Sequence, residues 1–175
     1  MKKITVWFDM DGTIADLYGH ENWLKRLRDE DATIFEELKP MCDMSEFLDD
    51  IYALLNANDA YVEIGIITWT PMEAPYKFQN ECAIAKTNWI EAYLPEIDEF
   101  HAIPYGTPKQ SVINTKQGYH ILVDDNEEVR KTWDTKVRRK SVDAKALYNS
   151  DQDNYGHDLA IEIVHLVEKM LENIK

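Results

Sequence analysis

The chain has few of the features that mark secreted or membrane-bound proteins. It has two cysteines, Cys42 and Cys82, which are too few for a disulfide framework and fit a reducing compartment. No apolar run approaches the length needed to span a bilayer. The first run, Ile4 to Phe8, ends at Asp9 before a signal-peptide core is complete. We therefore expect a cytoplasmic protein with no membrane partner.

Positive charge is also scarce. The chain has 19 Lys and Arg against 33 Asp and Glu, a formal net charge of -14. Such a charge repels the phosphate backbone of nucleic acids, and only Arg138, Arg139 and Lys140 form a cationic run. We expect a small-molecule partner and no nucleic acid polymer. Any site for a small phosphate must then supply positive charge locally, through a lysine, a metal ion or backbone N–H groups.

Glycine and proline are few and scattered, so no linker divides the chain, and its 175 residues suit one main core. Short runs rich in β-branched and aromatic residues alternate with helix-like stretches, which predicts an α/β fold with a parallel sheet. The expected strands cover residues 4–8, 61–68 and 119–123, with weaker ones at 100–103 and 140–142. The expected helices cover 45–56, with Ser45 as N-cap, 80–93, 127–133 and about 158–174.

Residues 17–44 interrupt the first strand-to-helix step and are longer than an ordinary loop. Helix-like segments lie around 21–28 and 33–38, so we expect a small helical cap at 17–44 inserted into a core of 1–16 and 45–175. The cap carries Tyr18, Trp23 and Phe35. These rings either stack on a nucleobase or, more commonly for large aromatics, pack the cap onto the core.

Acidic residues follow two of the apolar strands. Asp9 and Asp11 come directly after the first, and Asp124 and Asp125 end the run Ile121-Leu122-Val123. Because ligands of open α/β sheets bind at the carboxyl ends of the strands, these carboxylates are expected to meet at one edge. Their repulsion favours a hard cation with oxygen ligands, and Mg²⁺ is the natural choice. Thr68 ends a third strand, where its hydroxyl could donate to a phosphate oxygen.

Together these motifs resemble those of the phosphatases of the haloacid dehalogenase (HAD) superfamily. Residues 8–13 resemble the first motif, 66–68 the second and 122–125 the fourth. The third motif needs a lysine. Lys109, just past the strand at 100–103, is favoured by its strand-end position, while Lys86 lies on a helix that resembles one in the 5'(3')-deoxyribonucleotidases. The resemblance implies a Rossmann-like parallel sheet with helices on both faces and a small helical cap after the first strand.

The resemblance also implies a reaction. The protein would be a Mg²⁺-dependent phosphomonoesterase of the 5'-nucleotidase branch, hydrolysing a nucleoside monophosphate through an aspartyl-phosphate. Asp9 would attack phosphorus, and Asp11 would act as general acid and base. Thr68 and Lys109, or Lys86 in its place, would bind the substrate phosphate. The metal would be held by Asp9, the Asp11 carbonyl, Asp124 and Asp125.

Trp69 follows Thr68 at the expected mouth of the site and is a further candidate for binding the substrate phosphate. The deoxyribonucleotidases have a small residue there followed by proline, whereas this chain has Thr68-Trp69-Thr70-Pro71. Because of this departure, the substrate preference of the deoxyribonucleotidases does not carry over directly to this chain. Two alternatives therefore stay open, a phosphatase of a sugar phosphate or another metabolite and a non-catalytic binding module with the HAD fold.

Overall fold

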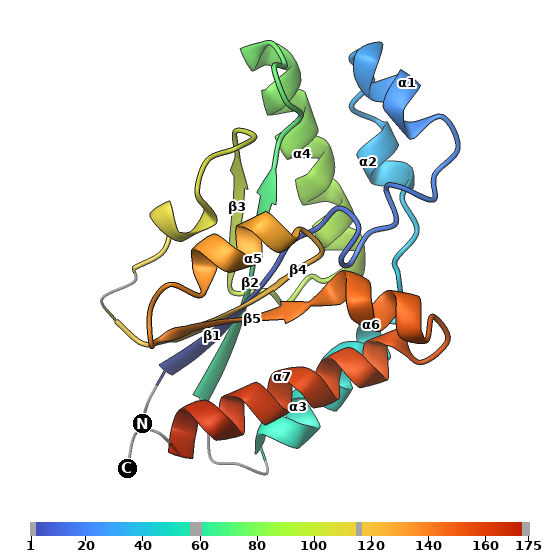
Figure 1. The fold of residues 1–175 in the computed structure, drawn as a ribbon. Helices are drawn as coiled ribbons and strands as arrows, with labels where there is room; N and C mark the ends of the chain where they lie inside the picture. Colours follow the sequence, from blue (N-terminus) through green and yellow to red (C-terminus); the bar gives the residue numbers. More distant parts are fainter. Residues whose placement is uncertain (1–2, 57–60, 115–116, 173–175) are drawn as a thin grey trace.

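A computed structural model describes residues 3–56, 61–114 and 117–172, and these form an α/β fold around a five-stranded parallel sheet in the order β3-β2-β1-β4-β5 (Figure 1). Each predicted strand is confirmed, with shifts of about one residue at its ends. The strands are β1 (Lys3–Phe8), β2 (Tyr61–Trp69), β3 (Glu99–Ile103), β4 (Tyr119–Asp124) and β5 (Arg139–Asp143).

The central strand β1 is apolar along nearly its whole length because both of its faces are covered. Val6 and Phe8 belong to the core on one face, and Trp7 belongs to a smaller core on the other. Strands β2 and β4 flank β1, with Phe8 opposite both Ile66 and Val123. The carboxyl ends of these three strands therefore lie at the same edge of the sheet.

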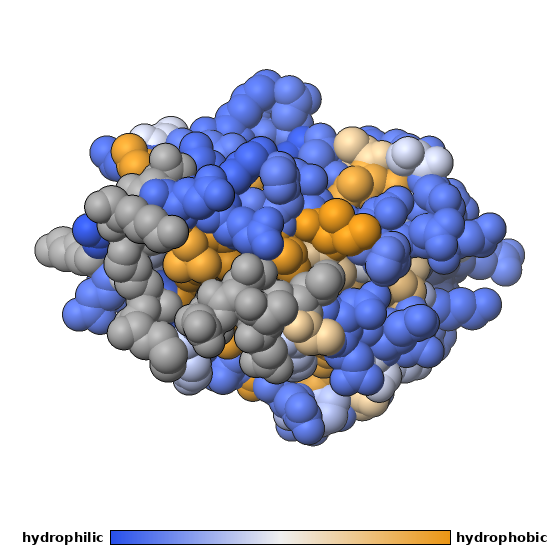
Figure 2. Space-filling model, turned by 90° about the horizontal axis from the view of Figure 1, so that it is seen from below, coloured by the Kyte–Doolittle hydropathy of each residue, from blue (hydrophilic) through white to orange (hydrophobic). Residues whose placement is uncertain are grey.

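Helices cover both faces of the sheet, as predicted. Side chains of α3 (Met44–Asn56), α4 (Tyr76–Tyr93), α6 (Ala144–Ser150) and α7 (Tyr155–Glu172) join the larger core, and α5 (Glu127–Trp133) joins the smaller one. Figure 1 shows α3 and α7 side by side. Seen from below, the surface is mostly hydrophilic, with hydrophobic side chains gathered near its centre (Figure 2). None of the described helices is long and apolar enough to cross a membrane.

The helix boundaries differ from the sequence predictions in ways that have local causes. Ser45 is not the N-cap of α3, because the helix begins at Met44 and the carboxylate of Asp43 accepts the backbone N–H groups of Ser45 and Glu46. Helix α4 begins four residues before the predicted Asn80, and its first turn holds a single buried apolar residue, Phe78, next to exposed Tyr76 and Lys77.

The C-terminal part of the chain holds a helix that the sequence pattern missed. Helix α6 has seven residues, and the side chain of Asp143 accepts the Ala146 N–H at its start. Seven residues are too few for a clear helical repeat, which explains the omission. Helix α7 confirms the last predicted helix, although Ile174, its predicted end, lies outside the described residues.

The inserted segment, residues 17–44, contains α1 (Trp23–Arg28) and α2 (Ile34–Glu37); α2 lies beside α4, and α1 contacts α2 (Figure 1). Phe35 of α2 is buried in the larger core, and Trp89 of α4 donates its indole N–H to the Leu38 carbonyl at 2.8 Å. Arg26 of α1 ties the segment together through hydrogen bonds to Asp31, Thr33 and Glu37. The segment is therefore anchored to α4 mainly through α2.

Candidate functional site

The strand ends bring together the polar residues that the sequence singled out. Asp9 follows β1, Thr68 lies near the end of β2, and Asp124 is the last residue of β4. A cavity of about 600 Å³ opens at this edge of the sheet and extends to the inserted segment. Its lining includes Asp9, Asp11, Lys109, Asp124 and Asp125 at the sheet, and Leu17, Tyr18, Trp23, Leu24, Leu27, Arg28 and Phe35 from the inserted segment.

Lys109 joins Asp9 to Asp124. Its Nζ donates to Asp9 Oδ1 at 2.6 Å and to Asp124 Oδ2 at 2.7 Å, and its side chain is buried. It is carried by η1 (Lys109–Ser111), a short 3₁₀ turn after β3. Burial disfavours the charged lysine, but Asp9 and Asp124 outweigh it and raise the pKa of Lys109. This side chain therefore supplies a fixed positive charge at the floor of the cavity.

Three carboxylates crowd the same point. One oxygen each of Asp9, Asp124 and Asp125 lie within 4.8 Å of one another. Burial and the negative charge of Asp9 raise the pKa of Asp124 to about 6, although Lys109 opposes the shift. Burial, Asp9 and Asp124 raise the pKa of Asp125 to about 7. A hard divalent cation among these oxygens would offset the repulsion, since such cations take oxygen ligands.

Asp11 occupies a different environment, although it lies two residues from Asp9. Lys86 Nζ donates to Asp11 Oδ2 at 2.6 Å, to Thr68 Oγ1 at 2.7 Å and to the Trp69 carbonyl at 2.9 Å. The second oxygen, Asp11 Oδ1, is buried and has no hydrogen-bond partner among the described residues. Burial raises the pKa of Asp11 and Asp9 adds to this, against the attraction of Lys86.

Both candidate lysines are thus at the site, and each serves a different aspartate. Lys109 contacts Asp9, whereas Lys86 contacts Asp11 and Thr68. Lys86 is fully buried on α4, unlike the solvated lysine expected of an ordinary helix. Its Nζ also lies 4.6 Å from the centre of the Phe35 ring, so the inserted segment covers this lysine.

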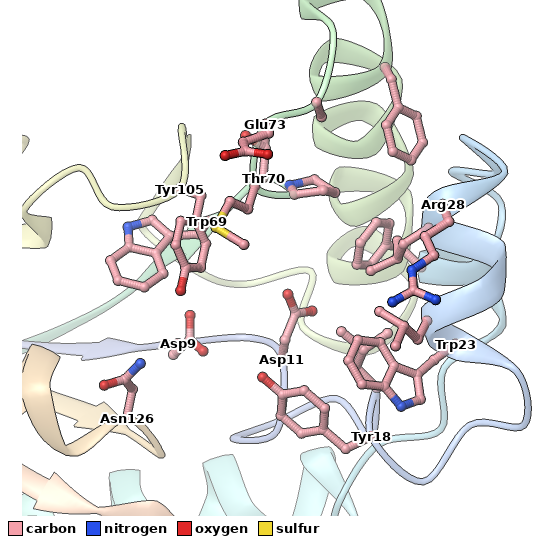
Figure 3. A pocket seen from close by; sticks show the side chains of 18 of the residues that line it. Asp9, Asp11, Tyr18, Trp23, Arg28, Trp69, Thr70, Glu73, Tyr105 and Asn126 are labelled. Carbon is pink, nitrogen blue, oxygen red and sulfur yellow. The ribbon is translucent and has the colours of Figure 1, made fainter.

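The aromatic candidates divide between packing and the cavity. Phe35 is 1% exposed and packs in the core, with one side of its ring bordering the cavity. Tyr18 and Trp23 line the cavity with their ring centroids 5.3 Å apart and the rings nearly perpendicular (Figure 3). Trp69 also lines it, but its indole N–H donates to the Thr107 carbonyl at 2.9 Å. Since an indole has one donor, Trp69 has none left for a phosphate oxygen.

Several lining residues were not predicted from the sequence. Arg28 is a charged residue on the α1 wall, and within the described part of the chain it makes no hydrogen bond or ion pair, in contrast to Arg26. The spacing of Trp23 with Leu27, and of Leu24 with Arg28, is the helical signal that could have identified this wall. Glu30, Glu73, Tyr105 and Asn126 line the cavity from loops without any such pattern.

Gly12, after the aspartate pair, has two reasons to be glycine. Its φ is +77°, and a Cβ there would lie 2.4 Å from Tyr18 Cε2 and 3.0 Å from Asp125 Oδ2. We expect Gly12→Ala to lower the free energy of unfolding by about 3 kcal/mol, from backbone strain plus the clash. Gly106 is the matched control, because its φ is +80° but nothing lies within 4 Å of its Cβ position.

Urea unfolding of the two glycine variants measures the difference. Gly106→Ala is expected to lower the free energy of unfolding only by the cost of backbone strain at positive φ, about 1 kcal/mol. Equal losses of unfolding free energy in the two variants would mean that a Cβ at position 12 does not clash with Tyr18 and Asp125.

Comparisons of the chain with protein-family models, with curated proteins and with solved structures found no match. The case for a function therefore depends on the geometry of this site and on the motif resemblance.

Proposed function

We propose that the protein is a Mg²⁺-dependent phosphomonoesterase of the HAD superfamily that acts on a nucleoside monophosphate through an aspartyl-phosphate. The observation that carries the proposal is the different surroundings of two neighbouring aspartates. Asp9 is bonded to Lys109 among the crowded carboxylates, whereas Asp11 is bonded to Lys86 and keeps one oxygen without a partner. The first arrangement suits an ionised nucleophile and the second suits a group that exchanges a proton.

The chemistry follows from this division. A carboxylate oxygen of Asp9 attacks phosphorus and forms the P–O bond of the aspartyl-phosphate, while the bond to the leaving oxygen breaks. Protonated Asp11 gives its proton to that oxygen. It then takes a proton from the water that attacks the phospho-aspartate, which releases phosphate and restores Asp9. Lys109 offsets the charge of the transferring group throughout.

The metal site of the proposal consists of Asp9, Asp124 and Asp125, with the Asp11 carbonyl as a further ligand. The raised pKa values of Asp124 and Asp125 support a cation here, because burial and, after it, the neighbouring carboxylates destabilise their ionised forms until positive charge is supplied. Bound Mg²⁺ would neutralise charge on the phosphoryl oxygens.

The walls of the cavity support a nucleoside as the leaving group. Leu17, Leu27 and Phe78 make part of the cavity apolar, and Trp23 offers a ring edge or face to a base. Arg28, whose guanidinium is without a partner in the described chain, can donate hydrogen bonds to oxygen acceptors on the substrate. A small sugar phosphate would leave much of this apolar surface uncovered.

Phosphate release from a substrate panel tests the proposal. The panel contains deoxyribo- and ribonucleoside monophosphates and sugar phosphates, each assayed with Mg²⁺ and with EDTA. We expect release that EDTA abolishes and Mg²⁺ restores, at least about tenfold faster for the best nucleotide than for any sugar phosphate. Preference for a sugar phosphate would support the metabolite phosphatase instead.

Calorimetric titration with Mg²⁺ supplies the control for a negative assay. A folded protein that binds Mg²⁺ but releases phosphate from no substrate would contradict the proposed activity and favour the binding module.

A further inference from the structure

We propose that the Tyr18 hydroxyl donates a hydrogen bond to an oxygen of the substrate's phosphoryl group. The inserted segment would then contact the reacting group itself as well as the leaving group. This inference rests on the proposed function, since it assumes that a phosphoryl group occupies the strand-end site.

The position of the Tyr18 ring is defined on two sides. The Cβ position of Gly12 lies 2.4 Å from Cε2 and 2.8 Å from Cδ2 of this ring, so the ring packs directly on the glycine backbone. Trp23 contacts it edge to face, with 5.3 Å between ring centroids and 82° between ring planes. Gly12 belongs to the loop that carries Asp9 and Asp11, and the ring is therefore held against the catalytic loop of the proposal.

The hydroxyl of Tyr18 faces the carboxylates. Figure 3 shows it directed from the inserted segment toward Asp9 and Asp11. Asp125 Oδ2 lies 3.0 Å from the same Gly12 Cβ position that the ring nearly touches. Tyr18 is 54% exposed as a whole, but partial burial of its ring raises its pKa and the charges of Asp125 and Asp11 raise it further, so the phenol keeps its proton. The group is accordingly a neutral donor at the edge of an acidic site.

This donor has no partner in the described part of the chain, although Tyr18 lines the cavity. Three other donors near the sheet edge already have partners: Lys109 donates to Asp9 and Asp124, Lys86 to Asp11 and Thr68, and the Trp69 indole to Thr107. A phosphoryl group bound at Asp9 brings further oxygen acceptors close to the carboxylates of Asp9, Asp124 and Asp125, which already repel one another. A free O–H that faces this place is suited to bind one of the phosphoryl oxygens.

Tyr18→Phe isolates the hydroxyl, because phenylalanine keeps the ring between Gly12 and Trp23. Binding is measured by calorimetry with orthovanadate, a phosphate analogue, in saturating Mg²⁺, and separately with Mg²⁺ alone. We expect the Kd of orthovanadate to rise about 10-fold or more and the Kd of Mg²⁺ to stay unchanged. With the best substrate of the panel, kcat/KM is expected to fall by a similar factor. Tyr76→Phe is the control, since that tyrosine is 83% exposed at the start of α4.

The other possible results separate a failure of the Tyr18 assignment from a failure of the proposed function. Orthovanadate affinity within twofold of wild type would overturn the assignment of Tyr18 while leaving the proposed function intact. Weaker Mg²⁺ binding in Tyr18→Phe would place the hydroxyl in the metal shell and overturn its contact with the phosphoryl group. Wild-type protein that binds Mg²⁺ but not orthovanadate would contradict the proposed function, and the Tyr18 assignment with it. The melting temperature of Tyr18→Phe should match wild type, because the hydroxyl has no partner to lose.

Discussion

Asp9→Asn is expected to lower phosphate release from the best substrate by at least about a thousandfold. The amide has nearly the shape of the carboxylate but lacks the negative charge and nucleophilic oxygen that the proposed attack on phosphorus needs. The fold should survive, since Lys109 keeps its bond to Asp124. Initial rates at saturating Mg²⁺, with circular dichroism to verify folding, measure the effect.

Asp49→Asn is the matched control for this variant. Asp49 is exposed on α3 and is not among the residues that line the cavity, so the same chemical change there should leave the rate unaltered. A folded Asp9→Asn protein that retains more than a tenth of the wild-type rate would exclude Asp9 as the nucleophile.

Lys86→Met is expected to have the largest effect on stability, lowering the free energy of unfolding by about 3 to 5 kcal/mol. The substitution leaves the Asp11 carboxylate without its cation and removes the donor that Thr68 and the Trp69 carbonyl share. For a chain of this length the loss corresponds to a melting temperature lower by roughly 6 to 20 °C. Calorimetric or optical melting measures it.

A second variant separates the loss of the ion pair from a loss of packing. Lys86→Met combined with Asp11→Asn removes both charges, so it should recover much of the stability, whereas a packing defect would persist. Lys77→Met is the control on the same helix, because its side chain is 88% exposed and its ion pair with Glu81 lies at the surface. We expect that change to stay within about 0.5 kcal/mol. Equal destabilisation by Lys77→Met and Lys86→Met would refute a buried pair at Asp11.

Much of the sheet edge was predictable because it depends on local pattern. Apolar strands buried on both faces have an unbroken sequence signal, and the residues that follow them are readable as strand ends. Asp9, Thr68 and Asp124 were identified in this way, and parallel pairing brings them to one edge. Three predicted helices, 45–56, 80–93 and 127–133, are likewise confirmed, with the earlier start of α4 as the main difference.

The choice between the two lysines could not be made from the sequence. A lysine on a helix has the same local pattern whether its head is in water or in a buried ion pair. Only the packing of α4 on the sheet, with Phe35 covering the side chain, brings Lys86 to Asp11. The position of Lys109 likewise depends on a short 3₁₀ turn that has no periodic signal.

The sequence by itself therefore determined the α/β class, the five strands and the aspartates at their ends, because hydrophobic periodicity and strand-end position are local properties. Tertiary structure alone decided which cation serves which aspartate, how the Tyr18 ring packs on Gly12, and that α1 forms a wall of the cavity. These contacts join residues far apart in the chain, Lys109 to Asp9 and Lys86 to Asp11 among them. They are set by the packing of whole elements against one another, which no short stretch of sequence encodes.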